Sequence, residues 1–225
     1  MTCNLKIKMN SVIILAAGIS NRFNAILPKQ FVLLYKNKTV LDFSVEAFKK
    51  NKFIDEIIIV VHNNWEKKIK AKYKNCKVIS GGESRSESSL IGLNQCTSSV
   101  KKVLIHDAAR PFVSQNIINQ CIKKLDLNDA VIPILHNVDS LIEIAENKIN
   151  YLNRDAIKIV QTPQAFQYHK IVSSYETKST STDDLSILLK NNKTAKCCFI
   201  DGEKNNFKIT NKNDILFAKK YFNEI

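Results

Sequence analysis

The chain has 225 residues, 44% of them hydrophobic and 24% charged, and 34 Lys and Arg against 21 Asp and Glu give a formal net charge of +13. This length and composition fit one ordinary soluble domain spanning residues 1–225. A helix that crosses a bilayer needs about 20 consecutive apolar residues. The longest apolar runs, such as residues 12–17 and 57–61, are far shorter, which excludes a membrane-inserted protein.

The N-terminus and the cysteines indicate a cytoplasmic protein. The first ten residues carry lysines, but the apolar run after them enters a glycine-containing loop instead of a small-residue cleavage site. Six cysteines without a C-x-x-C pair do not form a disulfide scaffold in a chain of this length. The adjacent Cys197 and Cys198 are expected on opposite faces of a strand. The four histidines lack ligand spacing, so the side chains predict no metal site.

The excess of basic residues admits two interpretations. Clustered Lys and Arg bind nucleic acid by releasing counterions from its phosphates. Here the lysines are spread from Lys6 to Lys220 among many Asn and Ile, as in a chain from an AT-rich genome. We therefore expect no nucleic-acid partner but a positive field that attracts a phosphorylated substrate. A non-catalytic nucleotide- or RNA-binding protein is the alternative from another functional class.

Short β-branched runs alternate with helical patterns along most of the chain. Strands are expected at residues 11–15, 56–61, 77–80, 100–105, 130–134 and 197–200. Helical patterns begin near Leu41, after Ser86 and at Ile117, where apolar residues recur three or four positions apart. Strands that alternate with helices form βαβ units. The sequence thus predicts an α/β fold with a Rossmann-like, mostly parallel sheet flanked by helices.

Residues 135–160 break this alternation with two short strand-like segments around the polar turn 146–148. The pattern predicts a β-hairpin arm that protrudes from the main sheet. An isolated two-stranded hairpin is marginal in water, so its apolar residues need a surface to pack against. These residues are Leu141, Ile144, Ile149 and Leu152. We expect a second subunit, in a homodimer, to supply that surface; the alternative is that the hairpin folds back on its own domain.

The loop after the first expected strand reads LAAGISNRFNAILPKQF. Ligands of open α/β sheets bind at the carboxyl ends of the strands, where this loop lies. Its small residues 16–18 let backbone N–H groups approach a phosphate, and Arg22 and Lys29 can neutralise it. The loop is neither a Walker A loop nor a G-x-G-x-x-G fingerprint. A strand-to-helix turn with solvated charges explains it equally well.

Two further loops also follow strand ends. The segment GGESRSESSL can hold a polar ring or a phosphate at a helix N-terminus, or it is a helix start capped by Ser86. The segment HDAARPF places Asp107 at the end of a hydrophobic strand, where its carboxylate suits a hydroxyl or a hydrated metal ion. Alternatively, Asp107 forms a local salt bridge with Arg110 that fixes the loop.

Taken in order, LAAG...R...PKQ, GG-x-x-R-x-x-S, HDAARP, TPQ and TDD resemble the motifs of the 2-C-methyl-D-erythritol 4-phosphate cytidylyltransferases of the non-mevalonate isoprenoid pathway. The resemblance runs from about residue 12 to 217. It implies a nucleotide-diphospho-sugar transferase type of fold. It also implies transfer of a cytidylyl group from CTP to methylerythritol phosphate, which gives 4-diphosphocytidyl-2-C-methyl-D-erythritol and pyrophosphate. The acceptor phosphate is already anionic, so the reaction needs cations, alignment and Mg²⁺ held mainly by the CTP phosphates.

The resemblance also implies roles for individual residues. Arg22 and Lys29 are expected to stabilise the transition state, Arg154 to place the acceptor from a neighbouring subunit, and Lys208 to draw the two phosphates together. The nucleotide pocket is expected to be lined by Ala16, Ala17, Gly18, Gly82, Glu83, Ser88 and Asp107. Contacts to the acceptor are expected from Asp107, Arg110, Ser140, Arg154, Thr162 and Lys208.

The nearest rival is the sister family of ribitol 5-phosphate cytidylyltransferases, which shares PKQF and TPQ. Its first loop more typically reads LAGG and its acid motif HDAVRPF, whereas this chain has Ala17 before Gly18 and Ala109 before Arg110. Both differences favour the methylerythritol family. The chain departs from that family at Ser20, where a second loop glycine is usual, and at Ser140, which replaces the commoner threonine.

Overall fold

The computed structural model describes residues 9–18, 27–146, 148–175, 181 and 183–223. Its strands are β1 (Met9–Ala16), β2 (Leu33–Tyr35), β3 (Lys38–Thr39), β4 (Glu56–Val61), β5 (Lys77–Ser80), β6 (Val100–Asp107), β7 (Ala130–His136), β8 (Leu141–Ala145), β9 (Lys148–Leu152), β10 (Lys158–Val160), β11 (Gln164–Gln167) and β12 (Cys197–Asp201). Its helices are the 3-10 helix η2 (Lys29–Phe31), α1 (Val40–Lys49), α2 (Asn63–Lys72), α3 (Arg85–Asn94), α4 (Gln115–Lys124), α5 (Tyr168–Ser174), α6 (Asp184–Asn191) and α7 (Lys212–Asn223).

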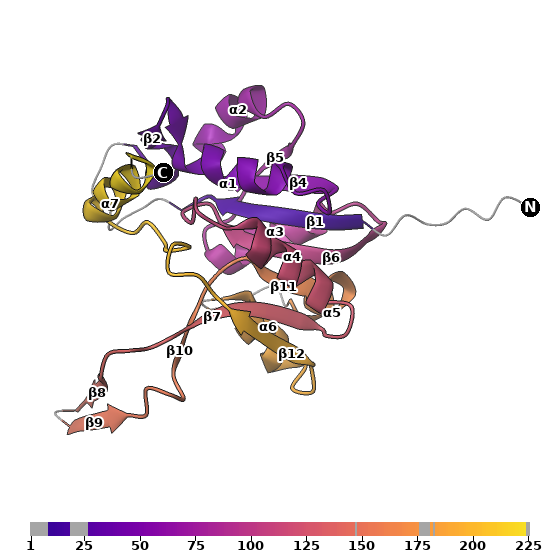
Figure 1. The fold of residues 1–225 in the computed structure, drawn as a ribbon. Helices are drawn as coiled ribbons and strands as arrows, with labels where there is room; N and C mark the ends of the chain where they lie inside the picture. The colour runs from indigo at the N-terminus through magenta and orange to yellow at the C-terminus, as the bar shows by residue number, and fades with distance from the viewer. Residues whose placement is uncertain (1–8, 19–26, 147, 176–180, 182, 224–225) are drawn as a thin grey trace, which may run out of the picture.

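Eight strands form the main sheet, in the order β10-β7-β11-β6-β1-β4-β5 with β12 paired to β7 (Figure 1). β1 lies between β4 and β6 and is parallel to both, and β5 is parallel to β4. β10 and β11 run antiparallel to their neighbours, while β12 is parallel to β7. The predicted Rossmann-like, mostly parallel sheet is confirmed, and its six expected strands are correct within two residues at each end.

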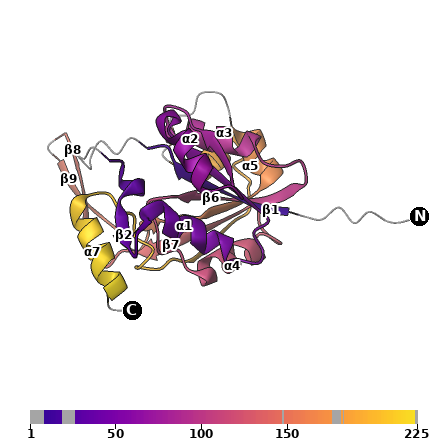
Figure 2. The ribbon, with the colours of Figure 1, turned by 90° about the horizontal axis from the view of Figure 1, so that it is seen from above.

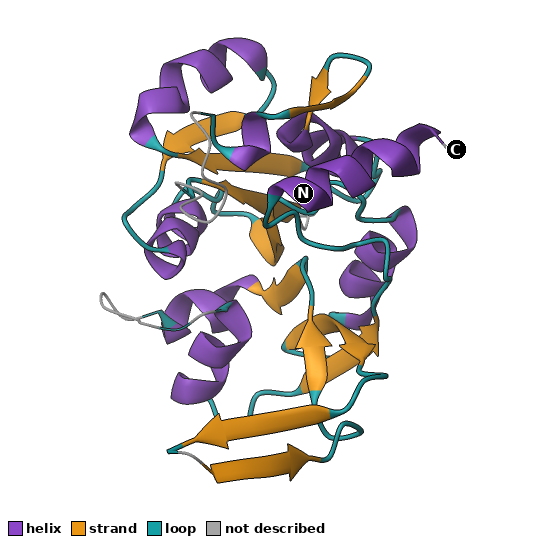
Figure 3. Cartoon of the chain, turned by 90° about the vertical axis from the view of Figure 1, so that its left-hand side faces the viewer, coloured by secondary structure: helices purple, strands orange, loops and turns teal. Residues whose placement is uncertain are grey.

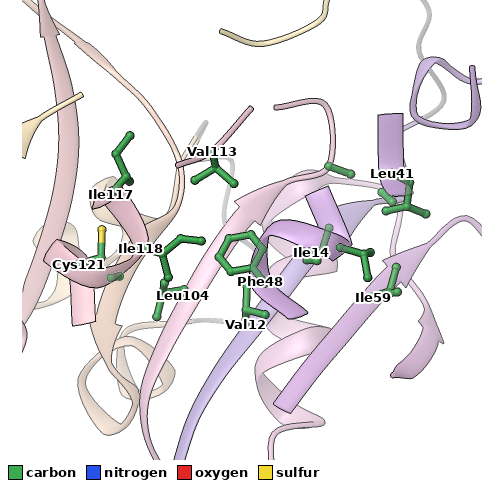
Figure 4. Close-up of a cluster of buried hydrophobic side chains, with 14 of the residues drawn as sticks. Val12, Ile14, Leu41, Phe48, Ile59, Leu104, Val113, Ile117, Ile118 and Cys121 are labelled. Atoms are coloured by element: carbon green, nitrogen blue, oxygen red, sulfur yellow. The ribbon is translucent and has the colours of Figure 1, made fainter. Parts of the chain in front are cut away.

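Helices cover both faces of the sheet. Successive side chains of a strand point to opposite faces, and in the central strands the side chains on both faces are apolar. Val12 and Ile14 of β1 pack with α1 and α4, whereas Ile13 packs with α3, α5 and α6. Figure 2 shows α1 and α4 on one side and α3 and α5 on the other. Phe48 of α1 is fully buried in the middle of the first cluster (Figure 4). Cys197 and Cys198 belong to opposite clusters, as predicted.

One helix start differs from the expectation. The N-cap of α3 is Ser84, whose side chain accepts a hydrogen bond from the backbone N–H of Glu87, whereas Ser86 lies inside the first turn and is buried. Ser84 and Glu87 have the Ser-x-x-Glu spacing of a capping box. The prediction of Ser86 as the cap is therefore wrong. The three-residue spacing from Ser84 to Glu87 is the feature of the sequence that favours Ser84 as the cap.

The hairpin arm projects from the main sheet (Figures 1 and 3). β8 and β9 pair in antiparallel register from Leu141 opposite Leu152 to Ala145 opposite Lys148. Ile144 and Ile149 are 68% and 64% exposed. Within the described chain the arm therefore does not fold back on its own domain, which removes that alternative. No helix among the described residues is long and apolar enough to cross a bilayer.

A fully buried histidine fixes the turn at the end of β6. The Nε2–H of His106 donates to the carbonyl oxygen of Arg110 at 3.1 Å, which leaves Nδ1 to accept from the hydroxyl of Thr162, also at 3.1 Å. The Thr162 hydroxyl in turn accepts from the backbone N–H of Asp107 at 3.1 Å. Burial lowers the pKa of His106 from 6.5 to about 4. The neutral imidazole thus joins β6 to the segment before β11.

The low pKa of His106 predicts a loss of stability in mild acid. The unfolded chain takes up this proton as the pH falls below 6.5, whereas the folded chain resists it down to pH about 4. The free energy of unfolding should fall by about 3 kcal/mol across that window from this residue. Urea unfolding at several pH values measures this slope. His106→Gln should flatten it, whereas replacing the exposed His169 should not; an equal slope in His106→Gln would contradict the assignment.

Candidate active site

The loops after β1, β5 and β6, together with η2, line a cleft of about 830 Å³. This volume suits a ligand of nucleotide size. The predicted nucleotide-binding residues all line it, as do two of the four predicted catalytic residues. They are Ala16, Ala17, Gly18, Gly82, Glu83, Ser88 and Asp107, with Lys29 and Lys208. Arg22 and Ser20 lie outside the described residues.

Gln30 holds the first loop in place. Its side-chain Nε2 donates to the carbonyl oxygens of Ala16 at 2.7 Å and Gly18 at 3.0 Å. These bonds satisfy backbone acceptors at the end of β1 and tie η2 to that end. Lys29, the residue before Gln30, lines the cleft as a result. Gln30 belongs to the PKQ motif, but no role for it was predicted from the sequence.

The second loop is tight because side chains of α3, β4 and the first loop surround Gly81. A Cβ there would lie 2.7 Å from Ser88 Oγ and 2.8 Å from the Cβ of Ala17, too close for any larger residue. Ser88 Oγ accepts from the backbone N–H of Gly82 at 3.2 Å, and Glu87 accepts from the backbone N–H of Glu83 at 2.9 Å. Side chains of α3 therefore set the shape of this loop where it borders the cleft.

Asp107 forms two salt bridges at the base of the cleft. Its Oδ1 lies 3.2 Å from Nε of Arg85, and its Oδ2 lies 2.7 Å from Nζ of Lys208. Burial alone would raise the pKa of Asp107, but the charges of Arg85 and Lys208 outweigh it and hold the pKa far below its usual range. The alternative of a salt bridge between Asp107 and Arg110 is wrong, because Asp107 pairs with Arg85 and Lys208 while the Arg110 guanidinium donates to the carbonyl oxygens of Asn206 and Val160.

Two predicted acceptor contacts lie behind the cleft and not among the residues that line it. Arg110 is 9% exposed, and its Nη1 donates to the carbonyl oxygen of Asn206 at 2.8 Å. Burial lowers the pKa of Arg110. The Thr162 hydroxyl is already bonded to His106 and to the backbone of Asp107. In this structure both residues shape the walls: Arg110 holds the segment that leads to Lys208, and Thr162 holds Asp107.

Ser140 and Arg154 lie on the arm, both exposed, outside the set of described residues that line the cleft of their own chain. Arg154 donates from Nη1 to the carbonyl oxygen of Val138 at 2.8 Å, which joins the two ends of the hairpin. The single chain therefore does not bring either residue to the predicted acceptor contacts of the cleft.

Two charged residues near the site had no predicted role. Arg85 lines the cleft and also donates from Nη1 to Asp184 at 2.7 Å, although 99 positions separate them in the sequence. Both belong to motifs that carried the resemblance, GG-x-x-R and TDD, but nothing in the sequence pairs them. In the described part of the chain, no group of three His, Cys, Asp or Glu side chains could hold a metal ion.

The chain is similar to a family of known enzymes. The model of the family 2-C-methyl-D-erythritol 4-phosphate cytidylyltransferase matches residues 10–224. A bifunctional enzyme IspD/IspF of Pelagibacter ubique is 39% identical over 93% of this chain, which spans only 57% of that relative. The 2-C-methyl-D-erythritol 4-phosphate cytidylyltransferase of Thermotoga neapolitana is 32% identical, over 94% of this chain and 96% of its own length.

Among solved structures, the 4-diphosphocytidyl-2C-methyl-D-erythritol synthase of Anaerococcus prevotii has the same fold. Its TM-score is 0.85 at 30% identity, and the match covers 98% of this chain and all of that one. The family match, the relatives and the fold therefore point the same way. The chain belongs to the family of 2-C-methyl-D-erythritol 4-phosphate cytidylyltransferases.

Proposed function

We propose that this chain transfers the cytidylyl group of CTP to 2-C-methyl-D-erythritol 4-phosphate. A phosphate oxygen of the acceptor attacks the α-phosphorus of CTP, the bond to the β-phosphate breaks, and pyrophosphate leaves. The products are 4-diphosphocytidyl-2-C-methyl-D-erythritol and pyrophosphate. The observation that carries the proposal is the convergence of Lys29 and Lys208, from opposite ends of the chain, on one cleft whose walls are small-residue loops.

The two small-residue loops suit the two ends of the nucleotide. Backbone groups of residues 16–18 can approach the triphosphate closely, because Ala and Gly present little side chain. The loop of Gly82 and Glu83 borders the cleft together with Ser88, and its backbone N–H groups, which donate to Ser88 and Glu87 in the single chain, would exchange these partners for the edge of a cytosine ring. Lys29 then stands on the triphosphate side of the cleft and Lys208 beside Asp107, where the acceptor phosphate must arrive.

The chemistry requires positive charge more than a base. The attacking phosphate monoester is anionic at neutral pH, so no residue has to remove a proton from it. Two phosphates must instead approach against their mutual repulsion, which Arg22, Lys29 and Lys208 would offset. Mg²⁺ would enter with the triphosphate and neutralise part of its charge. Glu83, Glu87 and Asp107 are the carboxylates among the described lining residues, and Glu87 and Asp107 already have partners in the protein.

The arm suits a homodimer in which each subunit completes the other's site. Its apolar side chains are exposed in the single chain, at a cost that a second subunit would remove. Arg154 and Ser140 are absent from the described lining of their own cleft. We propose that the arm of one subunit carries them to the acceptor side of the partner's cleft, where Arg154 would bind the phosphate of methylerythritol phosphate.

Removal of the two cations expected to stabilise the transition state should abolish most of the turnover. We expect Arg22→Ala and Lys29→Ala each to lower kcat by a factor on the order of 10² to 10³, because each removes a charge that acts on the transition state. Pyrophosphate release with Mg²⁺, CTP and methylerythritol phosphate measures this. Lys70→Ala removes the same charge from an exposed residue of α2 that does not line the cleft, and it should leave kcat unchanged. Near-normal turnover in Arg22→Ala and Lys29→Ala would refute their roles.

Arg154→Ala should raise the KM for methylerythritol phosphate more than the KM for CTP, because it removes an acceptor contact only. A mixing experiment tests which subunit's site Arg154 serves. Refolding Arg154→Ala together with Lys29→Ala should give mixed dimers with one intact site, and hence about a quarter of the wild-type rate at low acceptor concentration. If the mixture stays as slow as the two variants alone, Arg154 acts within its own chain.

A further inference from the structure

We propose that Asp184, with Tyr175 and Arg85, forms a positioning triad that acts through Asp107 to hold Lys208 at the cleft. The inference rests on the proposed function and extends it to three residues outside the predicted catalytic and binding set. It also gives a role to two motif residues, the Arg of GG-x-x-R and the last Asp of TDD, that the reaction itself does not use.

Asp184 is the fixed end of this network. Its side chain is fully buried at the first residue of α6. Oδ1 accepts from the Tyr175 hydroxyl at 2.5 Å, and Oδ2 accepts from Nη1 of Arg85 at 2.7 Å. The backbone N–H of Asp184 donates at 3.0 Å to Oε1 of Gln164, a residue of β11. The carboxylate is therefore held on both sides and through its own backbone.

Arg85 transmits this position to Asp107. The guanidinium is a rigid planar fork, so its contact with Asp184 through Nη1 constrains where its Nε can lie. That Nε lies 3.2 Å from Oδ1 of Asp107. A lysine could neutralise either acid but could not keep the two at a fixed angle. Burial would lower the pKa of Arg85, but the charges of Asp184 and Asp107 outweigh it and raise the pKa, so the fork stays charged.

The other oxygen of Asp107, Oδ2, connects the network to the cleft, because it lies 2.7 Å from Nζ of Lys208. The two carboxylates are the buried members, since the side chains of Asp184 and Asp107 are 0% and 10% exposed. The side chain of Lys208, at the far end of the network from Asp184, is 36% exposed. The buried end is thus the anchor and the exposed end is the cation that substrate can reach. When Lys208 turns to a phosphate, Arg85 remains to keep Asp107 in place and compensated.

Stability alone does not account for this arrangement, because removing charged groups from water lowers the free energy of unfolding that their pairing can contribute. Two carboxylates and a guanidinium have lost most of their water, and apolar side chains of the same volume often pack as well or better. The chain also contains a near copy of the triad elsewhere: Asp42 accepts from the Tyr73 hydroxyl at 2.5 Å and from Lys72 at 2.7 Å. None of these three residues lines the cleft, so the copy is a matched control.

The first test compares Asp184→Asn and Tyr175→Phe with Asp42→Asn and Tyr73→Phe by melting temperature and by steady-state pyrophosphate release. We expect Asp184→Asn to lower kcat about 10-fold or more while the KM for CTP changes less than about 3-fold, because Lys208 is displaced without loss of the nucleotide loops. Tyr175→Phe should lower kcat by a smaller factor. The control pair should lower the melting temperature with kcat unchanged. Equal kcat in Asp184→Asn and Asp42→Asn would overturn the inference.

A double-mutant cycle separates positioning from a general structural effect. If Asp184 acts through Asp107, Asp184→Asn should add less than about 2-fold to the kcat loss of Asp107→Asn, whereas independent effects would multiply. Multiplication of the two losses would contradict the proposal.

A structural measurement that does not depend on turnover distinguishes failure of this inference from failure of the proposed function. Absence of any pyrophosphate release from the wild type would refute the function and not the geometry. Crystal structures of the wild type and of Tyr175→Phe and Asp184→Asn then decide: we expect Arg85 to leave Asp107 and Lys208 to shift in Asp184→Asn. An unchanged contact between Arg85 and Asp107 would overturn the positioning role whatever the substrate.

Discussion

The buried carboxylate of Asp107 is the constraint on which the site depends. Asp107 is the last residue of β6 and its side chain is buried, so the cost of removing its charge from water must be offset by paired cations. One cation comes from α3 and the other from the segment between β12 and α7. These two salt bridges therefore hold α3, which follows the second loop, and the C-terminal segment against the end of β6. The same constraint explains why Arg110 and His106 are buried nearby, since they fix the backbone that presents Asp107 and Lys208.

The fold was predictable from sequence where a local pattern decides the structure. β4 and β5 have the expected bounds, because a short β-branched run between turn residues allows little else. The arm was also predictable, since its alternation interrupts the βαβ rhythm around residues 146–148. The helices α2, α5, α6 and α7 were not expected. In α2 only Ile69 is buried, and its packing in the hydrophobic cluster with residues of β4 and β5 supplies much of what stabilises this helix.

The candidate site was predictable as a set of loops but not as a set of contacts. The loops follow from strand ends, which the sequence shows. The partners of Asp107 depend on residues far away along the chain, and the adjacent Arg110 was a reasonable but wrong choice. Arg110 instead turns to Asn206, a bond that spans 96 positions. Charge pairing of this kind is decided by tertiary packing, so motifs identify the participants without showing which of them meet.

The proposed function is tested most directly by the rate of pyrophosphate release from CTP by the purified protein with Mg²⁺. The rate is compared with methylerythritol phosphate, with ribitol 5-phosphate and with no acceptor. We expect a kcat/KM for methylerythritol phosphate at least about 100-fold above that for ribitol 5-phosphate, since a site that hydrogen-bonds one polyol leaves buried groups unpaired with another. Without acceptor there should be almost no release. Equal or faster release with ribitol 5-phosphate would contradict the assignment.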